Sequence, residues 1–560
     1  MQLEILSDTL IDTNHHFKVS AGPGAGKTFW IVSHIKNVIQ NSTILTSAKK
    51  ILCITYTNTA AETIQSRLGT SSLQVEVLTI HSFLYTHIIK PYLSFISNEY
   101  DFDVSKLNGH DDTILSNYQF LQEWKEKTGQ KRIKEDDQIL TAFQKMRWRF
   151  DNNDLIVKPD YPIKINGYSI KNDSYFEYKK MAWKKGVLHH DDVLFFSLQI
   201  LKKFPFVSKI ISSKFPYIFI DEFQDSNPIQ ISIVKELARL STVGVIGDVA
   251  QSIYEFQGAE PGQFQTFNLV NNKNYYLNHN RRSSNEIIDF LNNIRKDFKQ
   301  QYHRNISFPK PILFVGDMVK ALKQAKLNCP EEDVHTLSWD NLTSNAMKAE
   351  INGSTLDKEL LNNLRQIDSN FHRGNLIFHC INAIALAKEA KFKEAIKILE
   401  KYLTYKNDKF GGRKKALRYL TILLKNFDKY KGGTLLELSN FVRENLDDQL
   451  TKVTSGKVKT FYESHSFQSL LLCVNIVEDN SLNRTIHKAK GAEFTNVLLI
   501  IKDQKSLEFI YNPDLANKEE HRLYYVAVSR AQNRLFICVP TLDMGIETLL
   551  QDILSIHRVE

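Results

Sequence analysis

One segment near the start of the chain constrains the fold more than any other. An apolar lead-in precedes three glycines, a lysine and a threonine, and a helix-like apolar pattern follows; the segment reads Val19-Ser20-Ala21-Gly22-Pro23-Gly24-Ala25-Gly26-Lys27-Thr28. This order predicts a strand, a tight loop and a helix. Backbone N–H groups of such a loop can close around phosphate oxygens at the helix N-terminus. The segment therefore predicts a phosphate-binding loop in an α/β fold, although Ala21 stands where the usual motif has glycine.

Each residue of this loop has an expected role. We expect the backbone at Gly22, Gly24, Ala25 and Gly26 to cradle the phosphates of a nucleotide. Lys27 would reach the outer phosphates, and the hydroxyl of Thr28 would hold Mg²⁺.

An acidic segment, Asp221-Glu222-Phe223-Gln224-Asp225, follows another apolar run at 215–220. The run predicts a buried parallel strand, so the carboxylates would emerge at its carboxyl end, where open α/β sheets bind ligands. We expect Asp221 to bind Mg²⁺ and Glu222 to orient and deprotonate the attacking water. The alternative for such an acidic cluster is the solvated start of a helix. Together the two segments predict a site that hydrolyses a nucleotide.

Size and composition narrow the class of protein. A length of 560 residues predicts about three or four domains, and 42% hydrophobic with 24% charged residues is ordinary for a globular protein. No apolar run approaches the length of a membrane span, and the N-terminus lacks a signal pattern. We therefore expect a cytoplasmic protein that does not associate with a membrane. The net charge of +9 is compatible with a polyanionic partner but does not identify one.

The five cysteines are far apart and form no Cys-x-x-Cys pair. This spacing argues against disulfides, zinc sites and iron–sulfur clusters. We expect most of them to be buried as small apolar side chains.

Short apolar strands alternate with helical patterns in two blocks, which predicts two parallel α/β domains. The first domain would comprise 1–83 and 205–268, and the second 269–350 and 477–560. The expected strands of the first are Phe17–Ser20, Ile51–Thr55, Val75–Thr79, Tyr217–Ile220 and Val243–Ile246. Those of the second are Ile312–Val315, Val497–Ile501 and Leu535–Val539.

Each domain is interrupted by a mainly helical insertion, at 84–204 and at 351–476. In the first we expect helices at Ile114–Lys127 and Ile139–Phe150. In the second, alanines in Asn382–Leu403 predict two close-packed helices. An ordinary helical hairpin is favoured over a tetratricopeptide unit, because no fixed repeat period is present.

Three further segments have two interpretations each. His189-His190-Asp191-Asp192 could suggest a metal site, but adjacent side chains point apart, and a helix start with an aspartate cap is favoured. The basic loops Gly411–Lys415 and Lys431–Gly433 could touch a phosphate backbone, although such loops are more often simply solvated.

Further motifs follow one another in a consistent order. They are Thr55–Ala61 (TYTNTAA), Thr79–Phe83 (TIHSF), Gly247–Ala259 (GDVAQSIYEFQGA), Asn280–Ser283 (NRRS), Thr485–Phe494 (TIHKAKGAEF) and Tyr525–Ala531 (YVAVSRA). With these motifs the chain resembles UvrD/Rep-type superfamily 1 DNA helicases over both α/β blocks. The resemblance implies two RecA-like P-loop domains, ATP with Mg²⁺ between them, and 3′-to-5′ movement on single-stranded DNA or on DNA with a 3′ tail.

The resemblance also assigns roles around the nucleotide. Gln251 would sense the γ-phosphate, and Arg282 and Arg530 would stabilise charge in the transition state, which planar guanidinium groups do well. Glu493 would accept a hydrogen bond from the ribose. Arg281 stands where the family has a tyrosine that stacks on adenine, and arginine can stack less specifically.

A second set of residues matches the family's DNA contacts. Tyr56, Phe83, Tyr254 and Phe256 would stack on successive bases, with core packing as the alternative for each ring. Asn58, His81 and His487 would make polar contacts to DNA, with an ordinary loop or core position as the alternative.

Several features depart from the family pattern. The glutamine that reads adenine is missing, since only Gln2 lies near its place, and Gln257 replaces an arginine after the stacking aromatic. Since about thirty residues follow Arg530, we expect no C-terminal nuclease. This compact form resembles the helicase subunit of Gabija-type anti-phage systems, which implies a separate partner nuclease of the OLD family.

We therefore expect a DNA-dependent ATPase that moves along single-stranded DNA, in repair or anti-phage defence. The alternative is a regulatory subunit that responds to nucleotide and DNA, controls a partner nuclease and unwinds little by itself. An RNA-directed helicase is a third option, because contacts to backbone and stacked bases do not read the 2′-hydroxyl.

Overall fold

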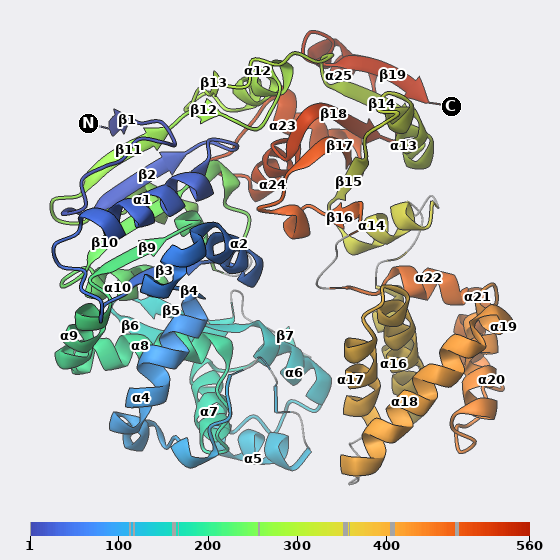
Figure 1. Ribbon diagram of the computed structural model, residues 1–560. Helices are drawn as coiled ribbons and strands as arrows, with labels where there is room; N and C mark the ends of the chain where they lie inside the picture. Colours follow the sequence, from blue (N-terminus) through green and yellow to red (C-terminus); the bar gives the residue numbers. More distant parts are fainter. Residues whose placement is uncertain are drawn as a thin grey trace. The chain divides into compact units, whose positions relative to one another are not determined.

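The computed structural model describes residues 2–110, 112, 114–115, 118–159, 164–165, 167–255, 258–350, 357, 359–403, 409–476 and 481–559. The chain forms two compact units (Figure 1). The first comprises Met1–Arg281, Asp297–His303 and Leu515–Arg522; the second comprises Arg282–Lys296, Arg304–Asp514 and Leu523–Glu560.

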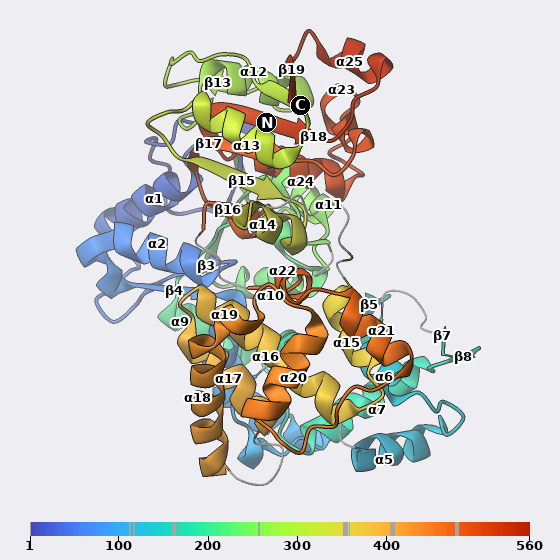
Figure 2. The same cartoon turned by 90° about the vertical axis from the view of Figure 1, so that its right-hand side faces the viewer.

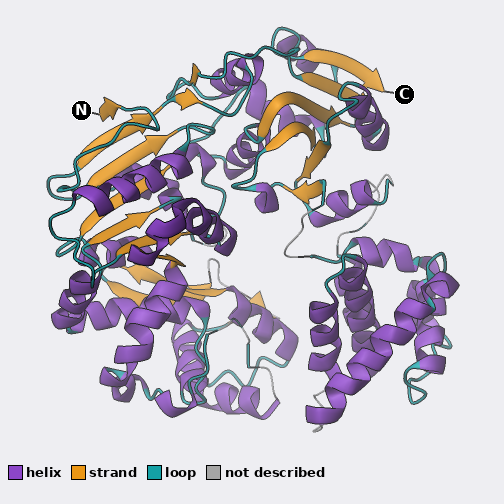
Figure 3. Ribbon diagram, viewed as in Figure 1, coloured by secondary structure: helices purple, strands orange, loops and turns teal. Residues whose placement is uncertain are grey.

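The first unit is built on a parallel sheet, whose strands are drawn in orange in Figure 3. The sheet has seven strands in the order β1-β11-β2-β10-β9-β3-β4. Central strands such as β9 are buried along their whole length, as expected for a parallel sheet covered on both faces. The strands are β1 (Gln2–Glu4), β2 (Phe17–Ala21), β3 (Ile51–Thr55), β4 (Val75–Thr79), β9 (Tyr217–Ile220), β10 (Thr242–Gly247) and β11 (Lys273–Leu277). All five strands expected for the first domain are confirmed.

The strand register brings the predicted site segments to one edge of this sheet. Gly247 of β10 lies opposite Ser20 of β2, and Val245 lies opposite Ile220 of β9. The phosphate-loop segment, the acidic segment and the Gly247 motif therefore all leave the sheet at the carboxyl ends of adjacent strands.

One strand lies in a different sheet from the one we expected. Residues from 269 onward were assigned to the second domain, but β11 pairs with β2 in the first sheet, with Tyr275 opposite Val19. Sheet membership depends on backbone pairing between distant segments, which the local pattern of apolar residues does not encode.

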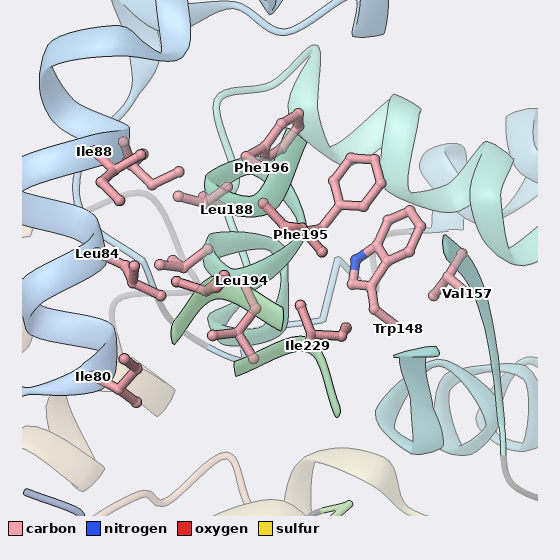
Figure 4. Close-up of a cluster of buried hydrophobic side chains, with 14 of the residues drawn as sticks. Ile80, Leu84, Ile88, Trp148, Val157, Leu188, Leu194, Phe195, Phe196 and Ile229 are labelled. Atoms are coloured by element: carbon pink, nitrogen blue, oxygen red, sulfur yellow. The ribbon is translucent and has the colours of Figure 1, made fainter. Parts of the chain in front are cut away.

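The first insertion packs directly onto this sheet. One continuous core joins Leu52 and Ile54 of β3 to aromatic side chains of the insertion, among them Trp148 and Phe195, whose stacked rings lie 3.8 Å apart (Figure 4). Helices of this unit are α1 (Lys27–Asn41), α2 (Asn58–Leu68), α3 (Ile80–Leu84), α4 (Lys90–Tyr92), α5 (Tyr118–Thr128), α6 (Asp136–Lys145), α7 (Asn172–Trp183), α8 (His190–Lys203), α9 (Pro205–Lys214), α10 (Pro228–Leu237) and α11 (Pro261–Thr266).

The insertion also contains strands that the sequence analysis missed. The helix expected at Ile139–Phe150 ends at Lys145, and β5 (Met146–Asp151) forms an antiparallel hairpin with β6 (Asp154–Pro159). Alternating burial of Met146 and Trp148 marks the strand period within what we took for one helical run. A second hairpin pairs β7 (Lys164–Ile165) with β8 (Tyr168–Ser169).

The histidine–aspartate segment is a helix start, as expected. The cap residue differs from the one expected, because the N-cap of α8 is His189 and not an aspartate. Asp192 stands at the third helical position, where its carboxylate accepts the His189 backbone N–H at 3.1 Å. Asp192 also accepts the indole N–H groups of Trp148 and Trp183 and pairs with Lys179 at 2.8 Å. Over the described part of the chain, no group of three His, Cys, Asp or Glu residues is arranged to hold a metal ion.

The second unit contains a six-stranded parallel sheet with the order β16-β15-β17-β18-β14-β19. The three strands expected here are confirmed. The strands are β14 (Ile312–Gly316), β15 (Val334–Ser338), β16 (Asn483–Thr485), β17 (Phe494–Ile500), β18 (Ala531–Val539) and β19 (Ser555–Val559). Its helices are α12 (Asn285–Ile294), α13 (Met318–Leu327), α14 (Asn341–Lys348), α23 (Glu508–Tyr511), α24 (Glu519–Val528) and α25 (Met544–Leu550), of which α24 begins in the first unit.

The second insertion is a helical bundle with its own apolar core (Figure 2). The predicted helix pair is confirmed, since α16 packs against α17. The helices are α15 (Leu360–Ile367), α16 (Phe371–Lys388), α17 (Phe392–Leu403), α18 (Lys409–Lys425), α19 (Phe427–Tyr430), α20 (Leu435–Asn445), α21 (Gly456–Ser464) and α22 (Phe467–Leu472). The loop expected at Gly411–Lys415 is wrong, because these residues belong to α18, whose Ala416 and Leu420 pack into the bundle core.

Two structural findings concern the cysteines and the apolar character of the helices. All five cysteines are free, and all except the half-buried Cys473 are buried. The helices described here include none that combines the length and the apolar character needed to span a membrane.

Candidate nucleotide and DNA site

The predicted phosphate loop, Gly22–Gly26, has the backbone that its glycines allow. Gly24 and Gly26 have φ angles of 70° and 82°, in the left-handed region that disfavours other residues. A Cβ atom added at Gly26 would lie 3.0 Å from Cβ of Ser7. The Arg281 backbone N–H donates to the Gly24 carbonyl at 2.8 Å. The loop is therefore held close to the chain on two sides, and glycine is needed at position 26 for conformation and for space.

Lys27 begins α1 directly after this loop. Its side chain is only 11% exposed, and Nζ lies 3.7 Å from Oε2 of Glu222. The described residues offer this Nζ no hydrogen-bond acceptor. A buried ammonium group beside a glycine-lined loop has the charge and position needed to bind a phosphate oxygen.

The acidic pair sits at the end of β9. Asp221 is buried, its N–H donates to the Ile54 carbonyl at 2.9 Å, and its Oδ1 accepts the Glu222 N–H at 3.0 Å. Glu222 has a φ of 54°, an unfavourable conformation for a residue with a side chain. Such strain at a strand end is typical of functional positions, and here it aims the Glu222 carboxylate toward Lys27.

A hydrogen-bond network behind Glu222 includes residues to which we had assigned no role. Gln224 donates to Glu222 Oε2 at 2.5 Å, and its Oε1 accepts the Asp248 N–H at 3.0 Å. The Asp248 carboxylate in turn accepts Nε2 of Gln251 at 2.6 Å. The structure thus brings the predicted Gln251 into one buried network with Glu222. Gln224 and Asp248 could have been suspected as polar residues directly after apolar strands.

Arg522 was also missed. It is fully buried on α24, where Nε donates to the Ser252 carbonyl at 2.8 Å and the guanidinium pairs with Glu255. Ser252 donates its hydroxyl to the Gln224 carbonyl at 3.1 Å. The network that begins at Glu222 therefore ends at an arginine three positions before the Tyr525 motif. A charged residue next to the apolar run at 523–528 was the signal available in the sequence.

Three of the predicted residues meet in the second unit. Arg282 pairs with Glu493 at 2.6 Å and donates to the Ser529 carbonyl at 2.9 Å. Arg530 is buried and donates to the Ser529 hydroxyl at 2.9 Å. Burial raises the pKa of Glu493, but Arg282 and Arg530 outweigh this effect and hold the pKa below its ordinary value. Glu493 is therefore ionised at neutral pH.

Arg281 directly precedes Arg282 in the chain but has different contacts. It belongs to the first unit, where its guanidinium lies 3.8 Å from an Asp8 carboxylate oxygen. We had placed it in the second domain. Its backbone bond to Gly24 puts it beside the phosphate loop, which is compatible with the expected contact to a base.

The predicted DNA contacts fall into different environments. Tyr56 and Tyr254 stack on each other with ring centroids 4.7 Å apart, and Asn58 is exposed at the start of α2. Phe83 is fully buried in the core and packs edge-on against Phe215, which corresponds to the core-packing alternative rather than to a base-stacking surface. His487 is half-buried in the second unit, and Phe256 lies outside the described residues.

A cavity of about 1170 Å³ adjoins some of these residues. Tyr56, Asn58 and His81 line it from the α/β part of the first unit, and Arg147 and Arg149 of β5 line it from the insertion. Burial and the neighbouring His190 and His110 lower the pKa of His81 to about 4, so His81 is neutral at pH 7. Arg147, Arg149 and Lys179 line the cavity as cations, and the sequence analysis did not single out any of the three.

Residues 7–273 match the family model described as the UvrD/REP helicase N-terminal domain. The chain is 28% identical over 339 residues to the Gabija protein GajB of Bacillus cereus (strain HuB5-5), which covers 52% of this chain and 48% of that protein. It is 27% identical over 295 residues to the ATP-dependent DNA helicase PcrA of Bacillus subtilis (strain 168), covering 51% and 38%.

A third relative extends over most of both chains. The ATP-dependent DNA helicase Rep of Buchnera aphidicola subsp. Schizaphis graminum (strain Sg) is 24% identical over 614 residues, covering 92% of this chain and 90% of that protein. By contrast, the matches to GajB and PcrA span about half or less of those relatives.

Proposed function

We propose that this chain, which is UvrD/Rep-like, hydrolyses ATP and uses the energy to move 3′-to-5′ along single-stranded DNA. The observation that carries the proposal is the Glu222 carboxylate held 3.7 Å from Lys27 Nζ beside a glycine loop, at the carboxyl ends of adjacent parallel strands. This arrangement matches what phosphoryl transfer to water needs, namely a phosphate-binding cation and a nearby base.

The roles of the site residues follow from their positions. The backbone of Gly22 to Gly26 would hold the phosphates, Lys27 would bind the outer ones, and Glu222 would orient the attacking water and accept its proton. Gln224 supports this role, because its amide fixes one oxygen of Glu222. Gln251 would report the state of the γ-phosphate through Asp248 and Gln224.

The residues also fit a Mg²⁺ ion. Asp221 is a buried carboxylate at a strand end, and Thr28 follows the phosphate-binding lysine with a hydroxyl group. These two residues would hold the ion, which supplies positive charge against the phosphate oxygens.

The second unit would supply the remaining charge. Arg282 and Arg530 provide fixed guanidinium groups to stabilise the transition state, and Glu493 would accept a hydrogen bond from the ribose. We also propose that the chain has two RecA-like domains. The first comprises 1–83 and 205–268 together with β11, and the second comprises the rest of 269–350 and 477–560. Tyr56, Asn58, His81, Tyr254, Phe256 and His487 remain our proposed DNA contacts.

Steady-state ATP hydrolysis with and without single-stranded DNA tests the proposal. We expect stimulation by DNA, and a loss of about 10²–10⁴-fold in Glu222→Gln, the range that general-base catalysis contributes. Lys27→Ala should be equally inactive, whereas the control Lys320→Ala, an exposed lysine on α13, should match the wild type. Retained turnover in folded Lys27→Ala would contradict the assignment.

A second function is favoured by the similarity to GajB, whose printed name is that of a Gabija protein. The chain would then be a regulatory ATPase that binds and controls a separate nuclease, of the OLD family by the same resemblance, with little unwinding of its own. Strand displacement by the protein alone, with a 3′-tailed duplex, separates the two functions. Robust unwinding favours the motor, and DNA-stimulated hydrolysis without unwinding favours the regulator.

A further inference from the structure

Three histidines meet in the cavity of the first unit, and the proposed function uses only one of them. His81 comes from α3, His110 from the segment before α5, and His190 from the start of α8. The Nδ1 atoms of His110 and His190 lie 2.5 Å apart. The ring centroid of His81 lies 5.9 Å from that of His190 and 6.4 Å from that of His110. Two of the three rings stand on packed helices, because Leu84 of α3 and Leu194 of α8 belong to one apolar core (Figure 4).

The short contact between His110 and His190 limits how many protons the pair can hold. At this distance one Nδ1 atom must donate a hydrogen bond and the other must accept it. The pair can keep the contact when both rings are neutral or when one of them is an imidazolium. It cannot keep the contact with two imidazolium rings, since both Nδ1 atoms would then carry a hydrogen. The contact therefore leaves room for one additional proton.

The rest of the cavity wall does not attract an anion while the histidines are neutral. Three cations and five carboxylates line the cavity, which gives a formal charge of −2. These charged residues, and the other titratable groups that line the cavity or pack on the cluster, are Arg147, Arg149, Lys179, Asp112, Asp191, Asp225, Glu255, Glu260, Tyr56, Tyr85 and His189. Lys179 already pairs with Asp191 at 2.9 Å and with Asp192 at 2.8 Å. Asp112 accepts the backbone N–H of His190 at 3.3 Å. A phosphate group in this cavity therefore needs positive charge that these residues do not supply.

We propose that His110 and His190 form a phosphate-binding subsite for single-stranded DNA, and that the pair takes up one proton when the DNA backbone enters the cavity. An imidazolium ring supplies both a positive charge and N–H donors to a phosphate oxygen. Histidine suits this role because its charge changes easily between pH 5 and pH 8. Tyr56 and Asn58, two of the proposed DNA contacts, line the same cavity. The phosphate would therefore belong to the strand that they bind.

Two observations assign the additional proton to the pair and the ligand to the anions. Burial and the two neighbouring histidines lower the pKa of His81 to about 4, so His81 stays neutral. Within the described ranges of the chain, no three His, Cys, Asp or Glu residues are arranged to hold a metal ion, so the cluster is not a metal site. The inference rests on the proposed function and adds that DNA binding is coupled to pH.

The sign of the pH dependence follows from the proton uptake. The DNA-bound protein holds one proton more than the free protein, so its affinity for DNA rises as the pH falls. One proton changes the dissociation constant by about tenfold per pH unit, so oligo-dT should bind up to about 100-fold more tightly at pH 6 than at pH 8. Phosphodiesters and thymine keep their charge over this range, so the change reports on the protein.

Isothermal titration calorimetry counts the protons directly. The full chain is titrated with oligo-dT at pH 7 in PIPES and in Tris, whose heats of ionisation differ, and the difference in heat gives the number of protons taken up. We expect about one proton for the wild type and about none for H110Q/H190Q. The matched control H303Q/H557Q removes two exposed histidines, one from each unit, and should keep the wild-type uptake.

Other outcomes overturn the proposal. Binding of oligo-dT by the wild type without proton uptake would refute it before any variant is made. Uptake that persists in H110Q/H190Q, or that is lost equally in the control, would place the proton elsewhere. If inorganic phosphate removes the uptake while oligo-dT binds as before, the subsite holds free phosphate and not the DNA backbone. If the double variant does not fold, H110Q alone makes the same test, because it removes one of the two rings that share the proton.

The proposed function can fail separately from this inference. Proton-linked binding of oligo-dT by a protein whose ATP hydrolysis is not stimulated by DNA would refute the proposed function and leave the phosphate subsite standing. DNA-stimulated hydrolysis with no proton uptake would refute the subsite alone.

Discussion

Gly26→Ala provides a direct test of how the phosphate loop is built. The residue has a φ of 82°, and a new Cβ would approach Cβ of Ser7 to 3.0 Å. The left-handed conformation costs a non-glycine residue about 1–2 kcal/mol. Crowding of this kind in a packed site costs a further 1–3 kcal/mol or so. The substitution should therefore destabilise the first unit by about 2–5 kcal/mol.

A matched substitution separates the two contributions. Gly129 follows α5 with a φ of 66°, and nothing lies within 4 Å of its Cβ position. Gly129→Ala should therefore show only the backbone cost of about 1–2 kcal/mol. The difference between the two variants measures the contact with Ser7.

Two assays report the result. Urea unfolding followed by tryptophan fluorescence gives the stability, and titration with a fluorescent ATP analogue gives the affinity. A loop displaced from Ser7 should bind the analogue about tenfold less tightly, which corresponds to about 1.4 kcal/mol. Ser7→Gly should restore part of the loss in Gly26→Ala. Equal stability of Gly26→Ala and Gly129→Ala, with wild-type affinity in both, would refute the reasoning.

Two other perturbations test the network and the core beneath the site. Arg522→Met leaves the buried Ser252 carbonyl and the Glu255 carboxylate without their donor, so we expect a loss of about 2–4 kcal/mol in urea unfolding and weaker stimulation of hydrolysis by DNA. The control is Arg534→Met, which breaks an exposed ion pair. An equal loss of stability in Arg534→Met would show that the buried contacts of Arg522 have no particular importance. His34 is stacked on Trp30, and burial lowers its pKa to about 3. In the unfolded chain His34 binds a proton below about pH 6.5, whereas in the folded chain it stays neutral. The free energy of unfolding should therefore fall by up to about 1.4 kcal/mol per pH unit between pH 6.5 and pH 3. His34→Phe should lose less stability than the wild type between pH 7.5 and pH 5, and identical losses would contradict this.

The local sequence was sufficient to predict features that depend on residues close together in the chain. The glycine loop, the strand before it and the helix after it are contiguous, and the φ angles at Gly24 and Gly26 are those that only glycine adopts easily. The helix start at His189 and the pair formed by α16 and α17 were likewise predictable, because capping and helical periodicity depend on neighbours within a few residues.

The errors came from interactions between distant segments. β11 joined the first sheet, β5 ended a run that we took for a helix, and Phe83 turned into the core. Each outcome depends on which remote surface is available for pairing or burial. Aromatic and apolar residues can pack against several such surfaces equally well, so their local pattern does not determine which surface they contact.

By itself, the sequence predicted a phosphate loop, an acidic pair after a buried strand and two parallel sheets, because each depends on residue types at short, fixed spacings. Only the tertiary structure decided how these parts are connected. Glu222, Gln224, Ser252 and Arg522 lie up to 300 residues apart, yet they form one hydrogen-bonded network. Hydrogen bonds of 2.5–3.1 Å need positions set by the packing of the whole unit, and no spacing along the chain specifies those positions.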